Sequence, residues 1–169
     1  MKKGIKVNIR KFKPEDEGQI VRYIKRAFCG KKFLFIALTK APDKKRQREW
    51  IESIKKKKKY CFVAEIDGKV IACLNFDLDK GRLRHRAAMG WSVDPEYWKK
   101  GVGSALLKKA VEKAKKIGLK RLECEIAKPN IASRKLVEKL KFKREGIKKK
   151  GMLLDNKKYV DTFIYGRII

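Results

Sequence analysis

The sequence predicts one α/β domain over residues 1–169, built on a mixed, mostly antiparallel sheet of about seven strands flanked by about four helices. Segments with the alternating polarity of strands take turns along the chain with segments that have the periodicity of amphipathic helices. The length of 169 residues suits one domain with one hydrophobic core, and no internal repeat or low-complexity linker interrupts the order.

The first third of the chain predicts one strand and two helices. Apolar and polar residues alternate over residues 5–12, which is typical of a strand. Residues 13–28 predict a helix, because Pro14 suits its first position and three acidic residues follow in the first turn. Residues 43–60 predict a second helix with Trp50 facing inward and with its lysine run as a solvated end.

The middle of the chain contains the clearest hairpin. Residues 60–66 and 69–76 flank the dipeptide Asp67-Gly68, which supplies the positive φ values of a tight turn. A further strand is predicted over residues 82–93. Its Gly90 indicates a bulge or a close backbone approach, because glycine is otherwise unfavourable inside a strand.

The second half continues the alternation. A helix is predicted after Trp98 and ends at Gly118. Residues 120–127 predict a strand that places Glu123 and Glu125 on the face opposite to its apolar residues. The remaining elements are a helix at residues 130–140 and two strands at residues 142–154 and 159–169, joined around Asp155 and Asn156.

The charge of the chain is extreme, since 48 Lys and Arg against 19 Asp and Glu leave a formal net charge of +29. Such a charge favours association with a polyanion such as RNA or a ribosome. The lysines are spread along every segment, however, and no zinc-finger spacing or RNA-binding aromatic motif is present. A lysine-rich surface of the kind reported for proteins of hyperthermophiles is the alternative interpretation.

Cysteine usage and hydropathy indicate a cytoplasmic protein without a metal site. Cys29, Cys61, Cys73 and Cys124 lie far apart in apolar segments and form no C-x-x-C pair, so we interpret them as small core residues. No apolar stretch is long enough to span a membrane, and the basic N-terminus is not followed by the apolar segment of a secretory signal.

The stretch "WKKGVGSALLKKA", residues 98–110, carries the clearest chemical signal. A strand that ends at Val93 is followed by a turn with Gly101 and Gly103 and then by a helix. This order brings free backbone N–H groups and the positive end of a helix dipole to one point, which attracts phosphate. By itself the G-x-G pattern is weak evidence, because it is neither a dinucleotide fingerprint nor a P-loop.

Together with its surroundings, the stretch over residues 93–146 resembles the core of the GNAT superfamily of acetyl-coenzyme A-dependent N-acetyltransferases. The family's signature Q/R-x-x-G-x-G/A, whose amides hold the coenzyme pyrophosphate, matches residues 98–103. Residues 62–76 are similar to the family's second and third strands, and residues 11–28 to its first helix. The resemblance covers nearly the whole chain, implies a GNAT-like fold with acetyl-CoA as co-substrate, and is greatest to the ribosomal-protein and amino-acid N-acetyltransferases.

The resemblance also implies where the coenzyme binds. Splayed strands are expected to accept the pantetheine arm along the strand that ends at Val93, with a backbone N–H near Val93 facing the developing oxyanion. Arg134 or Lys135 is expected at the 3′-phosphate. The residues expected to bind the coenzyme are Ser92, Val93, Lys99, Lys100, Gly101, Val102, Gly103, Ser104, Asn130, Ser133 and Lys135.

Four positions depart from the family pattern. Trp98 replaces the Gln or Arg of the signature, and Lys141 replaces a Gly that usually precedes Phe142. Ala88 stands where many relatives have a basic Glu, and Val137 where many have the Tyr that protonates the thiolate. The usual base and acid are therefore both missing.

Two other residues are candidates for those roles. Glu125 is the best remaining base, although a strand carboxylate paired with a lysine is the alternative interpretation. Tyr159, or Tyr165, is a candidate proton donor, although strand aromatics more often serve packing. Proximity and a tolerable thiolate leaving group still allow direct attack without either residue.

Two functions remain open. The first is an N-acetyltransferase that transfers the acetyl group of acetyl-CoA to a primary amine of a protein N-terminus, an amino acid or another small molecule. The second is a non-catalytic GNAT-like module that binds CoA or nucleic acid. The sequence leaves open the acceptor and whether the protein is a monomer or a homodimer.

Overall fold

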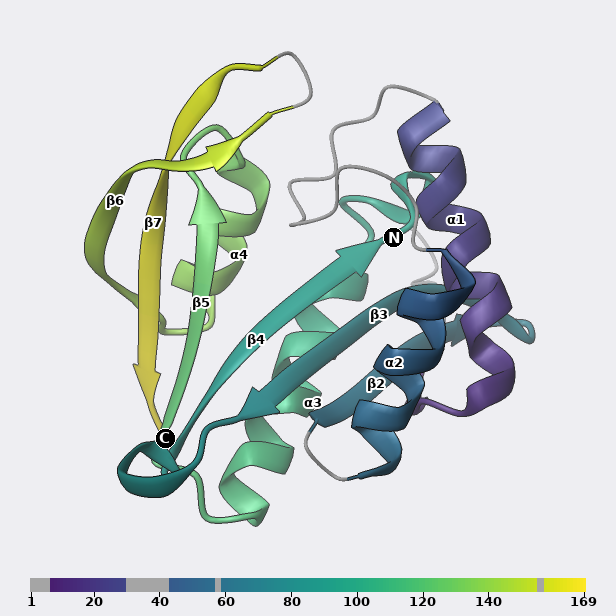
Figure 1. The fold of residues 1–169 in the computed structure, drawn as a ribbon, viewed down its shortest axis with the longest axis horizontal. Coiled ribbons are helices and arrows are strands. Elements are labelled where there is room, and N and C mark those ends of the chain that lie inside the picture. The colour runs from purple at the N-terminus through teal and green to yellow at the C-terminus, as the bar shows by residue number, and fades with distance from the viewer. Residues whose placement is uncertain (1–6, 30–42, 57–58, 155–156) are drawn as a thin grey trace, which may run out of the picture.

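The computed structural model describes residues 7–29, 43–56, 59–154 and 157–169. Strands and helices alternate in the predicted order (Figure 1). The elements are β1 (Asn8–Lys11), α1 (Glu17–Cys29), α2 (Lys44–Lys55), β2 (Lys59–Ile66), β3 (Lys69–Leu78), β4 (Arg86–Val93), α3 (Val102–Lys116), β5 (Arg121–Ala127), α4 (Ile131–Lys139), β6 (Lys143–Leu153) and β7 (Tyr159–Ile168).

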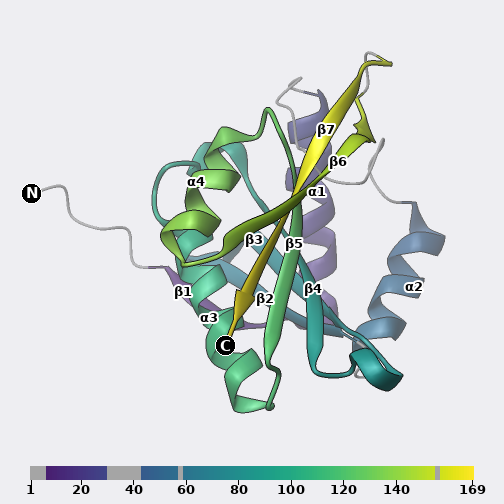
Figure 2. The same cartoon turned by 90° about the vertical axis from the view of Figure 1, so that its left-hand side faces the viewer.

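The strands form one seven-stranded sheet in the order β1-β2-β3-β4-β5-β7-β6. Every neighbouring pair is antiparallel except β4 and β5, which are parallel. Helices α1 and α2 lie on one face of the sheet and α3 and α4 on the other (Figures 1 and 2). The predicted mixed, mostly antiparallel sheet with four helices is therefore confirmed. Among the described helices, none is long and apolar enough to cross a membrane.

The sheet has an apolar core on each face. The larger core contains the inward face of α3, where the predicted residues Val102, Leu106, Ala110 and Ala114 are fully buried. The smaller core lies under α1, around Tyr23. Because both faces of the central strands are covered, β2 and β3 contain runs of buried residues rather than a strict alternation.

Two predicted boundaries are wrong. The helix predicted over residues 43–60 ends at Lys55, and β2 already begins at Lys59. The strand predicted over residues 82–93 begins only at Arg86, because the glycine at position 81 starts a short 3₁₀ turn. The turn predicted around Asp155 and Asn156, and residues 5 and 6 of the first strand, lie outside the described residues.

The expected bulge at Gly90 is also absent. Gly90 pairs with Asn75 in a register that runs without a shift along β3 and β4. Among the described residues, a Cβ atom at Gly90 would meet no other atom within 4 Å, so no described backbone approaches closely either. The glycine instead leaves open space beside β4.

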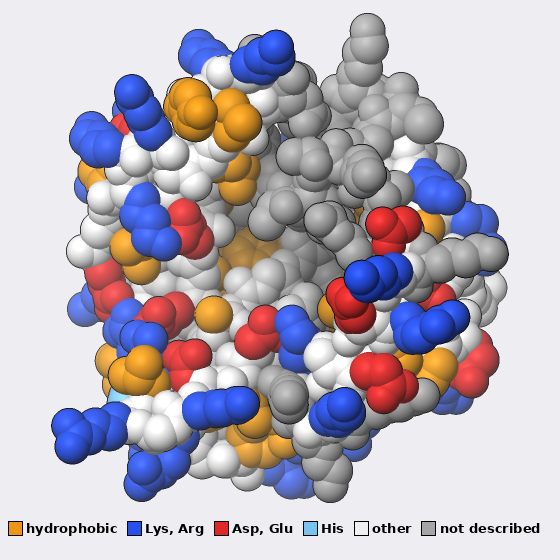
Figure 3. Space-filling model, viewed as in Figure 1, with side chains coloured by type: hydrophobic (Ala, Val, Ile, Leu, Met, Phe, Trp, Pro, Cys, Tyr) orange, Lys and Arg blue, Asp and Glu red, His pale blue; other side chains and the backbone are white. Residues whose placement is uncertain are grey.

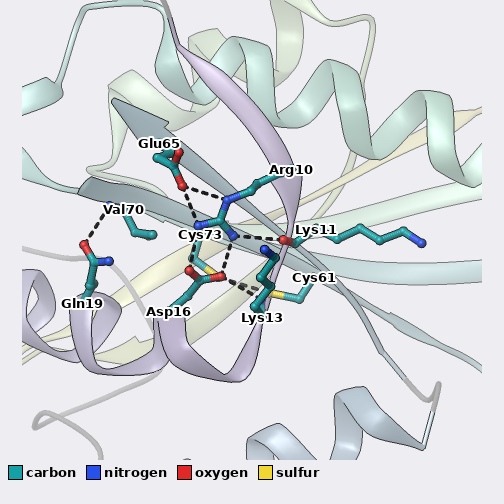
Figure 4. Close-up of polar contacts among 9 residues, drawn as sticks. All are labelled: Arg10, Lys11, Lys13, Asp16, Gln19, Cys61, Glu65, Val70 and Cys73. Atoms are coloured by element: carbon teal, nitrogen blue, oxygen red, sulfur yellow. Dashed lines mark hydrogen bonds and ion pairs between the residues drawn. The ribbon is translucent and has the colours of Figure 1, made fainter. Parts of the chain in front are cut away.

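A partly buried ion-pair network holds the start of α1 against the sheet (Figure 4). The Arg10 guanidinium on β1 donates to both carboxylate oxygens of Asp16, at 2.7 and 2.8 Å, and to Glu65 on β2 at 2.8 Å. Asp16 also accepts from the backbone N–H of Lys13, which fixes the turn before α1. The network therefore ties α1 to two strands at once.

Three cysteines are confirmed as buried core residues: Cys61, Cys73 and Cys124. The Sγ atoms of Cys61 and Cys73 are 3.3 Å apart, a neighbourhood that the sequence separation does not reveal. Burial raises the pKa of the Cys124 thiol to about 12, and the contact with Cys73 together with burial raises the pKa of Cys61 still further. The side chain of Cys29 lies outside the described residues.

These three thiols are expected to resist alkylation in the folded protein, because all three are buried and the reagent does not reach them. Iodoacetamide at about pH 8 should leave Cys61, Cys73 and Cys124 unmodified in native conditions and modify them rapidly in denaturant. Peptide mass spectrometry identifies the modified sites. Rapid modification of Cys73 in the native protein would contradict this account.

Candidate active site

The sheet opens between β4 and β5. These parallel strands are joined by three residue pairs, which run from Arg86 with Arg121 to Ala88 with Glu123. Beyond the last pair the strands diverge toward their carboxyl ends, as Figure 1 shows. Among the described strands, the rest of β4 from residue 89 to 93 therefore has no partner on this side, and its edge is available to an extended ligand.

A cleft of about 1720 Å³ occupies this opening. Its walls come from the second half of β4, from β5, and from the first residues of α3 and α4, with apolar residues of α1 on the other side. Figure 3 shows apolar side chains in the hollow of this face, with both basic and acidic side chains around it. A cleft of this size can hold a ligand larger than a typical drug molecule.

The start of α3 presents unbonded amides to the cleft. The carbonyl of Gly101, just before α3, accepts the first helical hydrogen bond, from the N–H of Ala105. Among the described residues, none accepts a hydrogen bond from the amides of Val102, Gly103 and Ser104. These three N–H groups and the helix dipole favour an anionic ligand, as the sequence predicts.

The two glycines of this loop serve different purposes. Gly101 has a φ of 81°, a left-handed conformation, and a Cβ atom there would meet no atom of another described residue within 4 Å. Gly103 lies inside α3, where a Cβ atom would meet Cδ2 of Leu136 at 3.0 Å. Gly103 is thus needed for close packing of α4 against α3, whereas Gly101 shapes the loop and keeps it open toward a ligand.

Trp98 anchors the loop to the sheet. Its indole N–H donates to the backbone carbonyl of Val93 at 2.8 Å, although the ring is 42% exposed. The side chain therefore connects the loop to the end of β4. At a second departure from the family pattern, Lys141 adopts a φ of 64°, a left-handed conformation that glycine adopts more readily than lysine.

The structure brings together nearly all of the residues predicted to bind the coenzyme. Lys100 is the exception, since its Nζ lies 5.1 Å from the centre of the Tyr97 ring and the residue does not line the cleft. The predicted residues that line the cleft are Ser92, Val93, Lys99, Gly101, Val102, Gly103, Ser104, Asn130, Ser133 and Lys135.

Asn130 and Arg134 have structural partners. The Asn130 side chain accepts from the N–H of Ser133 at 3.1 Å and so caps α4. Arg134 donates to the carbonyl of Lys128, and its guanidinium lies 4.7 Å from the centre of the Phe163 ring. Arg134 does not line the cleft, so of the two residues predicted near a 3′-phosphate only Lys135 does.

Glu125 lines the cleft, but both of its carboxylate oxygens are already engaged. One accepts from the Thr162 hydroxyl and the other from Nζ of Lys148. Partial burial by itself would raise the pKa of Glu125, but the hydrogen bonds from Lys148 and Thr162 outweigh it and lower the pKa. This arrangement is the lysine-paired carboxylate that the sequence left as the alternative, and it weakens Glu125 as a base.

The two tyrosine candidates lie away from the cleft. Tyr159 is 57% exposed and pairs with Leu153 near the end of the β6–β7 hairpin. Tyr165 is buried, and its hydroxyl donates to Glu138 at 2.7 Å on the α4 side of the sheet. Neither residue lines the cleft. Val137, at the position of the family pattern's proton-donating tyrosine, is fully buried in the larger core.

Two polar residues, Tyr23 and Glu123, were not among the predicted site residues. The Ser92 hydroxyl lies 2.7 Å from the hydroxyl of Tyr23, a buried residue of α1. Glu123, directly opposite Ala88, lines the cleft as well. The strand pattern did place Glu123 on this face, but only the pairing of β4 with β5 shows that it stands beside Ala88.

Comparisons with known proteins agree with this geometry. A family model described as "Acetyltransferase (GNAT) family" matches residues 29–142. The L-amino acid N-acetyltransferase AaaT of Escherichia coli (strain K12) is 33% identical over 108 residues, which cover 63% of this chain and 66%, just under two thirds, of that protein.

Solved structures share the fold over almost the full chain. The ribosomal-protein-alanine N-acetyltransferase of Brucella melitensis has a TM-score of 0.85 at 21% identity, covering 96% of this chain and 99% of that one. The yncA protein of Salmonella typhimurium, solved with its cofactor acetyl-CoA, has a TM-score of 0.84 at 20% identity, covering 96% and 93%. Because the family model matches more than half of its residues, the chain belongs to the acetyltransferase (GNAT) family.

Proposed function

We propose that this protein transfers the acetyl group of acetyl-CoA to a primary amine by direct attack. The observation that carries the proposal is the continuity of the cleft, which runs from the divergence of β4 and β5 to the unbonded amides at the start of α3. The amides suit the diphosphate of the coenzyme, and the free edge of β4 suits the amide groups of its pantetheine arm.

Basic side chains complete the coenzyme side of the cleft. Lys99 and Lys135 line it near the starts of α3 and α4 and can neutralise phosphate charge. Gly101 contributes through its open space and its left-handed backbone. The structure thus offers the anionic part of acetyl-CoA three kinds of partner: amides, a helix dipole and lysines.

The reaction releases one proton overall. The acceptor ammonium first loses a proton, its nitrogen forms a bond to the acetyl carbon, and the C–S bond breaks with its electron pair on sulfur. The nitrogen then loses a second proton, which ends on the CoA thiol. A thiol with a pKa of about 8.5 and an α-amine with a pKa of about 8 make both halves feasible near neutral pH, so positioning supplies much of the rate.

The acceptor is proposed as a primary amine of a protein N-terminus, an amino acid or another small molecule. Similarity to an L-amino acid N-acetyltransferase supports the amino-acid choice. The test is incubation of the protein with acetyl-CoA and panels of amino acids, peptides and diamines, with release of free thiol as the readout. We expect saturable acetyl-CoA binding and turnover with at least one class of amine.

Two outcomes separate the catalytic proposal from the non-catalytic alternative. Acetyl-CoA binding without thiol release for any acceptor would favour a module that only binds the coenzyme. The absence of saturable acetyl-CoA binding would contradict both the catalytic proposal and a coenzyme-binding module, and would favour a module that binds nucleic acid.

We also propose an electrostatic association with RNA, in the free form or in the ribosome. The edge strand β6 supports it, because five cations on this one strand are exposed: Lys143, Arg144, Lys148, Lys149 and Lys150. Charged edges also protect sheets from aggregation, so the salt dependence of binding is decisive.

Fluorescence anisotropy with an RNA oligonucleotide tests the association. Sub-micromolar affinity retained at about 0.15 M salt is expected for a defined surface. Replacing Lys143 and Arg144 by Glu should weaken binding more than the same change at Lys108 and Lys109 on α3. Equal losses in the two variants, or loss of all binding at that salt, would contradict a β6 surface.

A further inference from the structure

The last residue pair between β4 and β5 places the carboxylate of Glu123 beside an alanine, which has no functional group of its own. Ala88 on β4 faces Glu123 on β5, and both residues line the cleft where the strands begin to diverge. Ala88 contributes only a methyl group. Among the described residues, Glu123 therefore supplies the only carboxylate at the point where β4 and β5 separate.

Two arginines hold Glu123 by one oxygen. Its Oε1 accepts from Nε of Arg121 at 2.6 Å and from Nη1 of Arg86 at 3.2 Å. The same arginines also contact Glu145 and Asp79, so each guanidinium bridges two carboxylates. This clamp fixes the orientation of the Glu123 carboxylate without using its second oxygen.

The second carboxylate oxygen of Glu123, Oε2, is free to accept a hydrogen bond from a ligand. Among the described residues none donates a hydrogen bond to Oε2, and the side chain is 22% exposed, on the wall of the cleft. Glu125, two residues further along β5, has both oxygens occupied by Lys148 and Thr162. Of these two neighbours on one face, only Glu123 therefore offers a free acceptor to a ligand.

We propose that Oε2 of Glu123 receives the acceptor amine by accepting a hydrogen bond from its N–H. The inference rests on the proposed acetyl transfer and names the residue that orients the acceptor. The clamp by Arg86 and Arg121 aims the carboxylate, and the open space at Gly90 gives the acceptor room on the same face of β4. The proton that the ammonium loses passes over Oε2 to water in the cleft.

The test compares Glu123→Gln with Glu145→Gln. Gln keeps the shape of Glu123. When its carbonyl oxygen accepts from the arginines, its NH₂ group faces the cleft, so a hydrogen-bond donor replaces the acceptor Oε2. We expect kcat/KM for the amine to fall by about a hundredfold, as for loss of a group that handles a proton. Glu145→Gln disturbs the same Arg121 outside the cleft and should leave kcat/KM within about twofold.

Additional measurements separate this role from a structural one. The acetyl-CoA Kd measured by calorimetry should change by less than about threefold in Glu123→Gln, because the protein amides proposed to bind the coenzyme lie at the start of α3. Glu123→Asp should recover part of the lost kcat/KM. An unchanged kcat/KM in Glu123→Gln, or an equal loss in Glu145→Gln, would overturn the proposal. A wild-type protein that binds acetyl-CoA and acetylates no amine would instead overturn the proposed function.

Discussion

Replacing Gly101 with valine should weaken acetyl-CoA binding by about tenfold or more, the largest effect on coenzyme affinity expected of any single change in the cleft. The residue has a φ of 81°, where a side chain costs about 1–2 kcal/mol and a β-branched one more. Relief of this strain requires the backbone before α3 to turn, which re-aims the amides of Val102 and Gly103. Isothermal titration calorimetry with acetyl-CoA measures the loss.

Gly118→Val is the matched control. Gly118 has a φ of 80°, follows the other end of α3, and likewise has open space around its Cβ position. The two variants should therefore lose similar stability in urea unfolding, while only Gly101→Val loses acetyl-CoA affinity. Equal affinities in both variants would show that the amides before α3 do not hold the coenzyme.

Local pattern was sufficient to predict most of the elements of this fold. The acidic residues after Pro14 mark the start of α1, Gly118 marks the end of α3, and Asp67-Gly68 marks the hairpin between β2 and β3. Each of these signals acts on the backbone within a few residues. The errors arose where signals overlapped. The lysine run after Lys55 suits a helix end as well as the first residue of β2, and the arginines before β4 imitate strand alternation.

Much of the candidate site depends on contacts between distant segments, which a single sequence does not reveal. The motif around Gly101 was informative because strand, loop and helix are contiguous. The engagement of Glu125 by Lys148 and Thr162 depends on the pairing of β5, β6 and β7. Likewise, the packing need for Gly103 arises from α4, and the neighbourhood of Ala88 and Glu123 from a strand register.

Replacing Arg10 with methionine should destabilise the protein by about 3 kcal/mol, the largest stability effect expected of a single polar side chain here. Among the described residues, the change leaves the Asp16 carboxylate, 5% exposed, with the backbone N–H of Lys13 as its remaining donor, and it also removes the Arg10 partner of Glu65. Urea unfolding at neutral pH measures the loss. Lys59→Met is the control, because it removes an ion pair of similar length whose carboxylate, Asp77, is 47% exposed. This variant should lose less than about 1 kcal/mol of unfolding free energy.

The loss in Arg10→Met should depend on pH in a defined direction. Burial by itself raises the pKa of Asp16, but the hydrogen bonds from Arg10 and Lys13 outweigh it, so the pKa lies below its ordinary value of 3.8. A carboxyl whose pKa is depressed in the folded state stabilises the protein fully above the unfolded pKa and loses this contribution as pH falls through the folded one. The difference in unfolding free energy between wild type and Arg10→Met should thus be constant near neutral pH and narrow below about pH 4.

A double-mutant cycle tests whether the loss comes from an uncompensated buried charge. Adding Asp16→Asn to Arg10→Met removes that charge while keeping an oxygen that can accept from Lys13. The double variant should therefore be more stable than the sum of the single losses predicts, by at least about 1 kcal/mol. Strictly additive losses would mean that the pair contributes no coupling, and that α1 is held to the sheet by the apolar contacts around Tyr23 instead.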